Sequence, residues 1–148
     1  MSIWILKFYA EDAFDTAPGK IKTMKQELTR AELEIMQILW KKERAFVNEI
    51  LEDMPEPKPA YNTVSTIIRI LEKKGVVSHE AFGKSHRYFP LISKPEYTQS
   101  YMRNVMGNFF DNSVTQMFSF LAAKENLSAK EVEEIAELAR KTIEARKK

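Results

Sequence analysis

Polar side chains recur at helical spacing between Ala60 and Gly75. At 100° per residue, a helix over this stretch carries on one side Asn62, Ser65, Thr66, Arg69 and Lys73. Asparagine pairs bidentately with adenine, serine and threonine suit several base edges, and arginine or lysine reaches guanine or phosphate. Glu72 is the only acid in the stretch. The residue types fit a surface that contacts nucleic acid, although an ordinary amphipathic helix with a solvated polar face has the same pattern.

Such a helix needs a core to lie against, and its other side supplies Val64, Ile67, Ile68 and Leu71. The chain has 148 residues and 44% hydrophobic content, which suffices for one sizeable core or two small ones. The net charge is only +2, so any basic patch must be local. The lack of cysteine excludes disulfides, cysteine-bound zinc and thiol catalysis, and fits a reducing compartment such as the cytoplasm.

The first 24 residues are predicted to be an appendage. Their apolar run is short, is broken by Lys7 and is followed by acids, which fits neither a membrane span nor a signal peptide. No membrane insertion is expected. A misassigned start fits this segment, and so does a strand or helix packed on the body through Trp4, Phe8 and Tyr9.

Several helix starts can be located from capping pairs, in which a Ser or Thr is followed three residues later by Glu or Gln. The helix after the first pair carries an apolar stripe that is typical of a core. The predicted pairs are Thr29 with Glu32, Ser93 with Glu96, Ser113 with Gln116, and Ser128 with Glu131.

Between the first helix and the polar helix, the sequence predicts a short strand over residues 45–47 and a short helix capped by Asn48. Three prolines between Pro55 and Pro59 forbid a helix across the connection, so the polar helix starts afresh. Ala60 stands at its expected N-cap and has no side-chain acceptor.

After Gly75, a suitable residue to end a helix, two β-prone runs flank a Gly83-Lys84 tip and predict a hairpin. The order helix, short strand, helix, helix, hairpin is that of a winged helix-turn-helix, in which the third helix enters the major groove of DNA. Cations at the wing lie where phosphates would run. The predicted DNA-binding residues are Tyr61, Asn62, Thr63, Ser65, Thr66, Arg69, Lys73, Lys74, Lys84, His86 and Arg87.

From residue 93 onward, the chain has more large apolar side chains than three short helices can cover by themselves. An exposed patch of this kind implies a partner surface, and burial against a two-fold copy gives a homodimer with two reading heads. In the alternative, these side chains pack onto the winged domain. The predicted dimer interface consists of Tyr97, Tyr101, Val105, Met106, Phe109, Phe110, Met117, Phe118, Leu121 and Ile135.

The predicted fold is therefore mostly α with a small β wing. Its parts are an N-terminal appendage at residues 1–24, a winged helix DNA-binding domain at residues 25–92, and a helical dimerization domain at residues 93–148.

Three runs carry a family resemblance: LTRAELEIMQILWKKE, YNTVSTIIRILEKKGVVSHEAFGKSHRYFPLIS and KENLSAKEVEEIAELARK. Together they resemble the BlaI/MecI/CopY family of penicillinase-type transcriptional repressors, from about Leu28 to the C-terminus. The resemblance implies a sequence-specific repressor that binds a pseudo-palindromic operator in double-stranded DNA as a homodimer.

The resemblance also implies how repression is relieved. In the β-lactam branch, a membrane sensor metalloprotease leads to cleavage of the repressor in its dimerization region, typically at an Asn-Phe bond. The aligned region, Ser119, Phe120 and Leu121, lacks that Asn, while Asn108-Phe109 matches in letters but lies too early. The copper branch uses a C-terminal cysteine motif that this chain does not contain. No metal, cofactor or catalytic residue is predicted.

Other classes of function fit the sequence less well. An enzyme has little support, because His79 and His86 both lie in the hairpin and no nucleophile elbow, phosphate loop or zinc-protease motif is present. A winged helix that docks a protein is an alternative, since the polar helix face has few cations beyond Arg69 and Lys73. A ligand-sensing repressor is another, and would need a pocket between the domains. Steep salt dependence of binding to duplex DNA separates DNA binding from protein docking.

Overall fold

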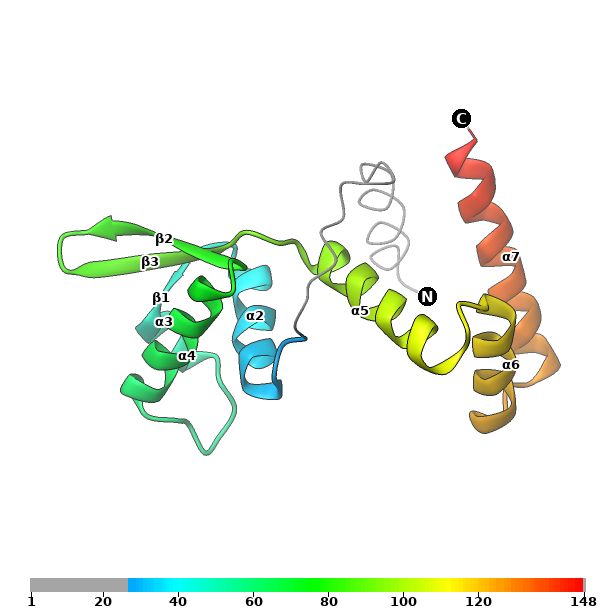
Figure 1. Cartoon of the computed structure of the whole chain (residues 1–148), viewed down its shortest axis with the longest axis horizontal. Coiled ribbons are helices and arrows are strands. Elements are labelled where there is room, and N and C mark those ends of the chain that lie inside the picture. The colour runs from blue at the N-terminus through cyan, green and yellow to red at the C-terminus, as the bar shows by residue number, and fades with distance from the viewer. Residues whose placement is uncertain (1–26, 148) are drawn as a thin grey trace. The chain divides into compact units, whose positions relative to one another are not determined.

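The computed structural model describes residues 27–147, so the predicted appendage lies outside the described residues. Two compact units divide between Tyr97 and Thr98. The first is a winged helix, and the second is helical (Figure 1). The first unit contains α2 (Arg30–Lys42), β1 (Ala45–Phe46), α3 (Val47–Glu52), α4 (Tyr61–Lys73), β2 (Val77–Phe82) and β3 (Ser85–Pro90). The predicted mostly α fold with a small β wing is confirmed.

Three further helices complete the described chain: α5 (Lys94–Phe109), α6 (Val114–Lys124) and α7 (Ala129–Arg146). The first turn of α5 belongs to the winged unit and the rest to the second unit. Within residues 27–147, no helix combines the length and apolar character that crossing a membrane would require.

All of the predicted capping pairs form. The hydroxyls of Thr29, Ser93, Ser113 and Ser128 each accept a hydrogen bond from the amide three residues later, at 3.1–3.2 Å. Where that residue is Glu, its carboxylate accepts from the capping hydroxyl at 3.0–3.2 Å. These local bonds fix where α2, α5, α6 and α7 begin, because the capping side chains satisfy amides that a helix leaves unpaired.

The start of α3 differs from the prediction. The helix begins at Val47 with Phe46 as its N-cap, so Asn48 lies inside the first turn and does not cap it. The Glu49 carboxylate accepts a hydrogen bond from the Phe46 amide at 2.9 Å and closes this turn. By contrast, α4 starts after Ala60 without a side-chain cap, as the sequence predicts.

The sheet has the strand order β1-β3-β2, and both pairings are antiparallel. Phe82 pairs with Ser85, which leaves Gly83 and Lys84 as the tip of the hairpin. Gly83 has a φ of 62°, a left-handed conformation that favours glycine. The predicted hairpin is confirmed, and it extends past the helices of its unit (Figure 1).

The core of the winged unit lies between α2, α3, α4 and the sheet. The α4 side chains Val64, Ile68 and Leu71 are fully buried, and Ile67 packs at the edge of the same cluster. Burying each such side chain contributes roughly 1.5–3 kcal/mol. The other buried members of the cluster are Ile35, Met36, Leu39, Ala45, Val47, Ile50, Met54, Val76, Val77 and Tyr88.

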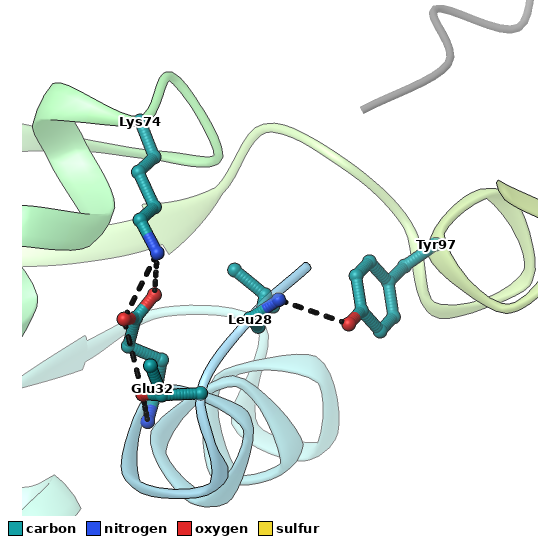
Figure 2. A network of polar contacts seen from close by, with 5 residues as sticks. Leu28, Glu32, Lys74 and Tyr97 are labelled. Atoms are coloured by element: carbon teal, nitrogen blue, oxygen red, sulfur yellow. Dashed lines mark hydrogen bonds and ion pairs between the residues drawn. The ribbon is translucent and has the colours of Figure 1, made fainter. Parts of the chain in front are cut away.

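The first turn of α5 closes the winged unit. The Tyr97 hydroxyl accepts a hydrogen bond from the Leu28 amide at 3.2 Å (Figure 2), and the Tyr97 ring lies 6.0 Å from the Trp40 ring. The Trp40 indole donates to the Ile92 carbonyl at 2.9 Å. The unit therefore extends past residue 92, where the sequence predicted the domain to end. Tyr97, which was assigned to a dimer interface, is instead buried within this unit.

The part of the second unit that the structure describes, residues 98–147, lacks a fully buried apolar core. Among residues 98–147, no large apolar side chain is buried. Neither α6 nor α7 contains a buried residue. The described helices of this unit are thus amphipathic, and their apolar side chains are exposed or half-buried.

Candidate nucleic-acid interface

The polar face of α4 is accessible along its length. Tyr61, Asn62, Thr63, Thr66, Arg69 and Lys73 are exposed, and Ser65 is half-buried. These side chains point away from the core because Val64, Ile68 and Leu71 occupy the opposite side of the helix. The apolar side of α4 therefore anchors the helix in the core, and the polar side is exposed to solvent.

A groove of about 940 Å³ lies between this face and the wing. β1 and the start of α3 supply a further part of its wall. The groove is lined by Phe46, Val47, Asn48, Glu49, Tyr61, Asn62, Ser65, Thr66, Arg69, Phe82, Lys84, Ser85, His86 and Tyr88. The lining combines polar side chains from a helix with a lysine at the hairpin tip. Such side chains suit contacts with the bases and phosphates of a nucleic acid.

The groove brings together a subset of the predicted DNA-binding residues. Tyr61, Asn62, Ser65, Thr66 and Arg69 line it from α4, and Lys84 and His86 from the wing. The predicted residues outside its lining are Thr63, Lys73, Lys74 and Arg87.

Lys74 has an intramolecular partner. Its ammonium group lies 2.7 and 3.0 Å from the two carboxylate oxygens of Glu32 (Figure 2). Glu32 is buried, and its carboxylate also accepts from the Thr29 hydroxyl. Lys74 is therefore paired within the winged unit, and a contact with DNA would leave a buried carboxylate without its cation. The phosphate contact of Lys74 stays a prediction.

Arg87 lies on β3 opposite both Phe46 and Glu80. The side chain is half-buried, and its Nε atom is buried without a hydrogen-bond partner within the described chain. The pairing of β3 with strands on both sides thus places Arg87 within the sheet rather than along the groove.

Sequence reasoning missed the residues that β1 and α3 bring to the groove. Phe46 packs edge-to-face against Phe82, with ring centroids 5.8 Å apart, and Asn48 is exposed beside them. These residues could have been found by pairing the predicted short strand with the predicted hairpin. In the structure, Phe46 pairs with Arg87, and this pairing brings β1 next to the wing. The exposed aromatic Phe82, next to the predicted tip, was a second signal.

Salt bridges and ring contacts hold the wing in place. Arg44 donates to the Glu80 carboxylate at 2.7 Å, and its guanidinium lies 5.6 Å from the Phe89 ring centroid. Tyr88 is buried at the base of the groove, and this burial raises the pKa of its hydroxyl, with the Glu72 charge adding to the effect. Tyr88 therefore stays neutral near physiological pH.

The apolar side chains of the second unit form a second candidate surface. Phe109 is 75% exposed, the largest value among the exposed large apolar side chains of this unit. The rings of Phe110 and Phe120 contact one another at 5.7 Å. Of the predicted interface residues, Tyr101, Phe109, Leu121 and Ile135 are exposed, whereas Val105, Met106, Phe110, Met117 and Phe118 are half-buried.

The predicted cleavage region lies within α6. Ser119, Phe120 and Leu121 are all exposed. No group of three or more potential ligands is suitably placed to hold a metal ion in the part of the chain that the structure describes.

Comparisons with known proteins agree with the motifs in the sequence. A family model described as "Penicillinase repressor" matches residues 28–141. The chain is 28% identical to the "Methicillin resistance regulatory protein MecI" of Staphylococcus aureus (strain N315) over 116 residues, which cover 78% of this chain and 94% of that protein. It is 24% identical to the "Penicillinase repressor" of Bacillus licheniformis over 113 residues, which cover 76% and 88% of the two chains.

A solved structure was also matched. The "Solution structure of the DNA binding domain of the repressor BlaI" is 28% identical in the aligned part, with a TM-score of 0.44, and the match covers 51% of this chain and 92% of that one. The relatives are thus named for regulation and repression rather than for an enzymatic activity.

Proposed function

The chain belongs to the penicillinase repressor family and is a DNA-binding repressor, and from this premise we propose how it recognises its operator. Two copies of the chain bind a pseudo-palindromic operator, and each inserts α4 into the major groove. Asn62, Ser65 and Thr66 face base edges, while Arg69, Lys73 and Lys84 face phosphates. The observation that carries this proposal is the groove that residues of the polar face of α4 and of the tip of the wing line together.

Salt dependence tests the DNA-binding mode directly. Each phosphate contact releases counterions, so the logarithm of affinity should fall linearly with the logarithm of salt concentration, with a slope of about −0.9 per contact. We expect several contacts per copy from the cations named above. Fluorescence anisotropy with the full chain and a labelled duplex measures the slope. A slope near zero would indicate a protein-docking module instead.

Thr66 can read only some bases, because its hydroxyl is already engaged. The hydroxyl donates to the Asn62 carbonyl at 2.9 Å, which uses its single proton. It therefore cannot also donate to guanine, whose major-groove edge offers acceptors. The methyl group of Thr66 and the lone pairs of its hydroxyl remain for a thymine methyl or for an amino group.

We predict that the methyl group is the part that matters. Thr66→Val keeps the methyl and should preserve the ratio of operator to random-DNA affinity, whereas Thr66→Ser should lower that ratio about fivefold, the equivalent of about 1 kcal/mol for one base contact. The operator is first selected from a pool of random duplexes. The affinity of each variant for this operator and for random DNA then gives the ratio. The reverse order of the two variants would show that the hydroxyl makes the contact.

The homodimer is proposed from the second unit. Its exposed apolar side chains lack cover among residues 98–147, and a two-fold copy offers an equally apolar surface. Joining two winged units raises the effective concentration of the second on the operator, which strengthens binding without any new contact with DNA.

Relief of repression is proposed to occur by cleavage within α6, with a membrane sensor metalloprotease as the upstream partner. The bonds from Ser119 to Leu121 are exposed, and α6 buries no residue, so local unwinding of this helix costs little. Mass spectrometry of the repressor from β-lactam-treated cells would locate the cut. A repressor that stays intact while its genes are induced would refute this step.

A further inference from the structure

Tyr88 lies at the bottom of the groove between α4 and the wing, and it is 6% exposed. Among the residues that line this groove, only Val47 and Tyr88 are buried, and Tyr88 is the one with a polar group in its side chain. Its backbone is held on both sides, because Tyr88 pairs with Ala45 of β1 and with His79 of β2. Packing and strand pairing therefore fix the Tyr88 ring in one place.

The Tyr88 hydroxyl has no hydrogen-bond partner among residues 27–147. A buried tyrosine usually directs its hydroxyl to a partner, because an unpaired polar group costs free energy. A phenylalanine would fill the same space in the core without this cost. The hydroxyl is thus a donor that the fold of the winged unit does not use, and a group that enters the groove can pair with it.

The hydroxyl faces the groove rather than the core. Among the described residues, the fully covered side-chain polar atom without a partner is Nε of Arg87, so the unpaired Tyr88 hydroxyl is not fully covered. Burial raises the pKa of Tyr88, the Glu72 charge raises it further, and the Arg69 charge acts in the opposite direction. Arg69 lines the groove from α4, whereas Glu72 does not line it and contacts Nδ1 of His79 at 2.5 Å. The hydroxyl therefore keeps its proton and can donate a hydrogen bond to a group in the groove.

The charged groups of the lining favour an anion. Its cations are Arg69 and Lys84, which are both exposed and form no ion pair within the described chain. Its acid is Glu49, whose carboxylate accepts a hydrogen bond from the Phe46 amide at 2.9 Å. His86 adds an imidazole that can donate from a ring nitrogen. An anion in the groove would thus meet two unpaired cations and one acid that is already engaged.

Depth decides which part of a nucleic acid can reach Tyr88. Base edges lie inside the grooves of a duplex, where protruding side chains such as the exposed Asn62 and Thr66 can contact them. Phosphates lie on the outside of the duplex, and their oxygens accept hydrogen bonds from tyrosine hydroxyls. We propose that the Tyr88 hydroxyl donates a hydrogen bond to a phosphate oxygen of the operator backbone, in the groove that Arg69 and Lys84 also line. This inference rests on the proposed DNA-binding mode and adds an uncharged contact to it.

Tyr88→Phe tests the contact, because it keeps the ring that packs in the core and removes only the hydroxyl. The melting temperature should not fall, since the hydroxyl has no partner within the described chain. The affinity of the full chain for duplex DNA should fall about tenfold per copy, the size expected for one hydrogen bond to a charged group. The fall should be equal for the operator selected from random duplexes and for a mixed-sequence duplex, because every sequence carries the same phosphates.

Salt dependence distinguishes this contact from those of the cations. Tyr88→Phe removes no positive charge, so its affinity should be lower by the same factor at every salt concentration, with the wild-type slope. Lys84→Ala is the matched control from the same groove, and it should flatten the slope by about 0.9 per copy. Fluorescence anisotropy with a mixed-sequence duplex of roughly three helical turns, or 30 base pairs, measures both slopes.

Neutral phosphates locate the contact on the DNA. The selected operator is synthesised with one phosphate at a time replaced by an uncharged methylphosphonate, and each duplex is bound to the wild type and to Tyr88→Phe. At one phosphate per half-site, the replacement should cost the wild type several-fold more affinity than it costs the variant. At the other phosphates the two losses should be equal, because only interacting groups show such coupling.

Each outcome bears on a defined claim. Wild-type affinity in Tyr88→Phe, or equal losses in both proteins at every replaced phosphate, overturns the contact while leaving the proposed function intact. A loss for the operator but not for the mixed-sequence duplex overturns it as well, because the hydroxyl would then contact a base. If Tyr88→Phe is less stable, the comparison between phosphates still decides, since damage to the fold affects all positions alike. Failure of the wild type to bind any duplex overturns the proposed function and this inference together.

Discussion

Phe109→Asp is expected to convert the dimer into monomers and to lower affinity for a palindromic operator by roughly 10²–10⁴-fold. The Phe109 ring is 75% exposed in the single chain, so the substitution removes little from the fold of that chain. In a dry interface between two copies, the same substitution would bury an unpaired charge, which costs several kcal/mol. Sedimentation equilibrium reports the oligomeric state, and anisotropy reports the affinity.

The neighbouring residue offers a matched control. Asn108 is also exposed on α5, and Asn108→Asp adds the same charge to the same turn at a polar position. It should leave both the dimer and the affinity nearly unchanged. Circular dichroism should show that both variants retain their helices. A Phe109→Asp protein that stayed dimeric would place the interface elsewhere, and a monomeric one with full operator affinity would refute the link between dimerization and repression.

Lys74→Met is expected to lower the free energy of unfolding by about 3 kcal/mol and the melting temperature by about 10 °C or more. The side chain of Glu32 is 7% exposed, and that of Lys74 is 20% exposed. Without the ammonium group, the Glu32 carboxylate would still accept a hydrogen bond from the Thr29 hydroxyl, and the Glu32 amide would still donate to that hydroxyl. The carboxylate would, however, lose its counterion. Denaturant unfolding of the full chain, followed by circular dichroism, gives the stability.

The distinctive feature of this prediction is that DNA binding should hardly change. At temperatures where the variant is folded, Lys74→Met should keep the wild-type salt slope, whereas Lys84→Ala should reduce the slope by about one contact without loss of stability. The double variant Glu32→Leu/Lys74→Met should regain most of the stability, because no unpaired charge remains. A flatter salt slope in Lys74→Met would support the predicted contact of this residue with phosphate.

Local chemistry explains why much of the winged unit could be predicted. The capping hydroxyls bond to amides only three residues away, and the two sides of α4 follow directly from helical spacing. The hairpin is likewise set by two β-prone runs around Gly83 and Lys84. Each of these features depends on residues that are close in sequence.

The contacts that sequence reasoning did not predict join residues that are distant in sequence. Lys74 bonds to Glu32, 42 residues earlier, and Tyr97 accepts from the amide of Leu28, 69 residues earlier. Spacing along a helix correctly places both side chains on a polar or apolar side but cannot show which other element covers that side. The same limit hid Phe46 and Asn48, which the pairing of β1 with β3 carries to the groove.

The separation of roles on α4 has a consequence for how such repressors diverge. Its buried residues Val64, Ile68 and Leu71 carry the stability, while the exposed Asn62 and Thr66 make no contribution to the core. Substitutions on the exposed side should therefore be nearly neutral for folding, within about 0.5 kcal/mol. After a gene duplication, one copy could therefore change its operator preference through successive substitutions on the exposed side of α4. Each intermediate protein would still fold. Paralogous repressors in one genome can then acquire separate targets while retaining the same scaffold.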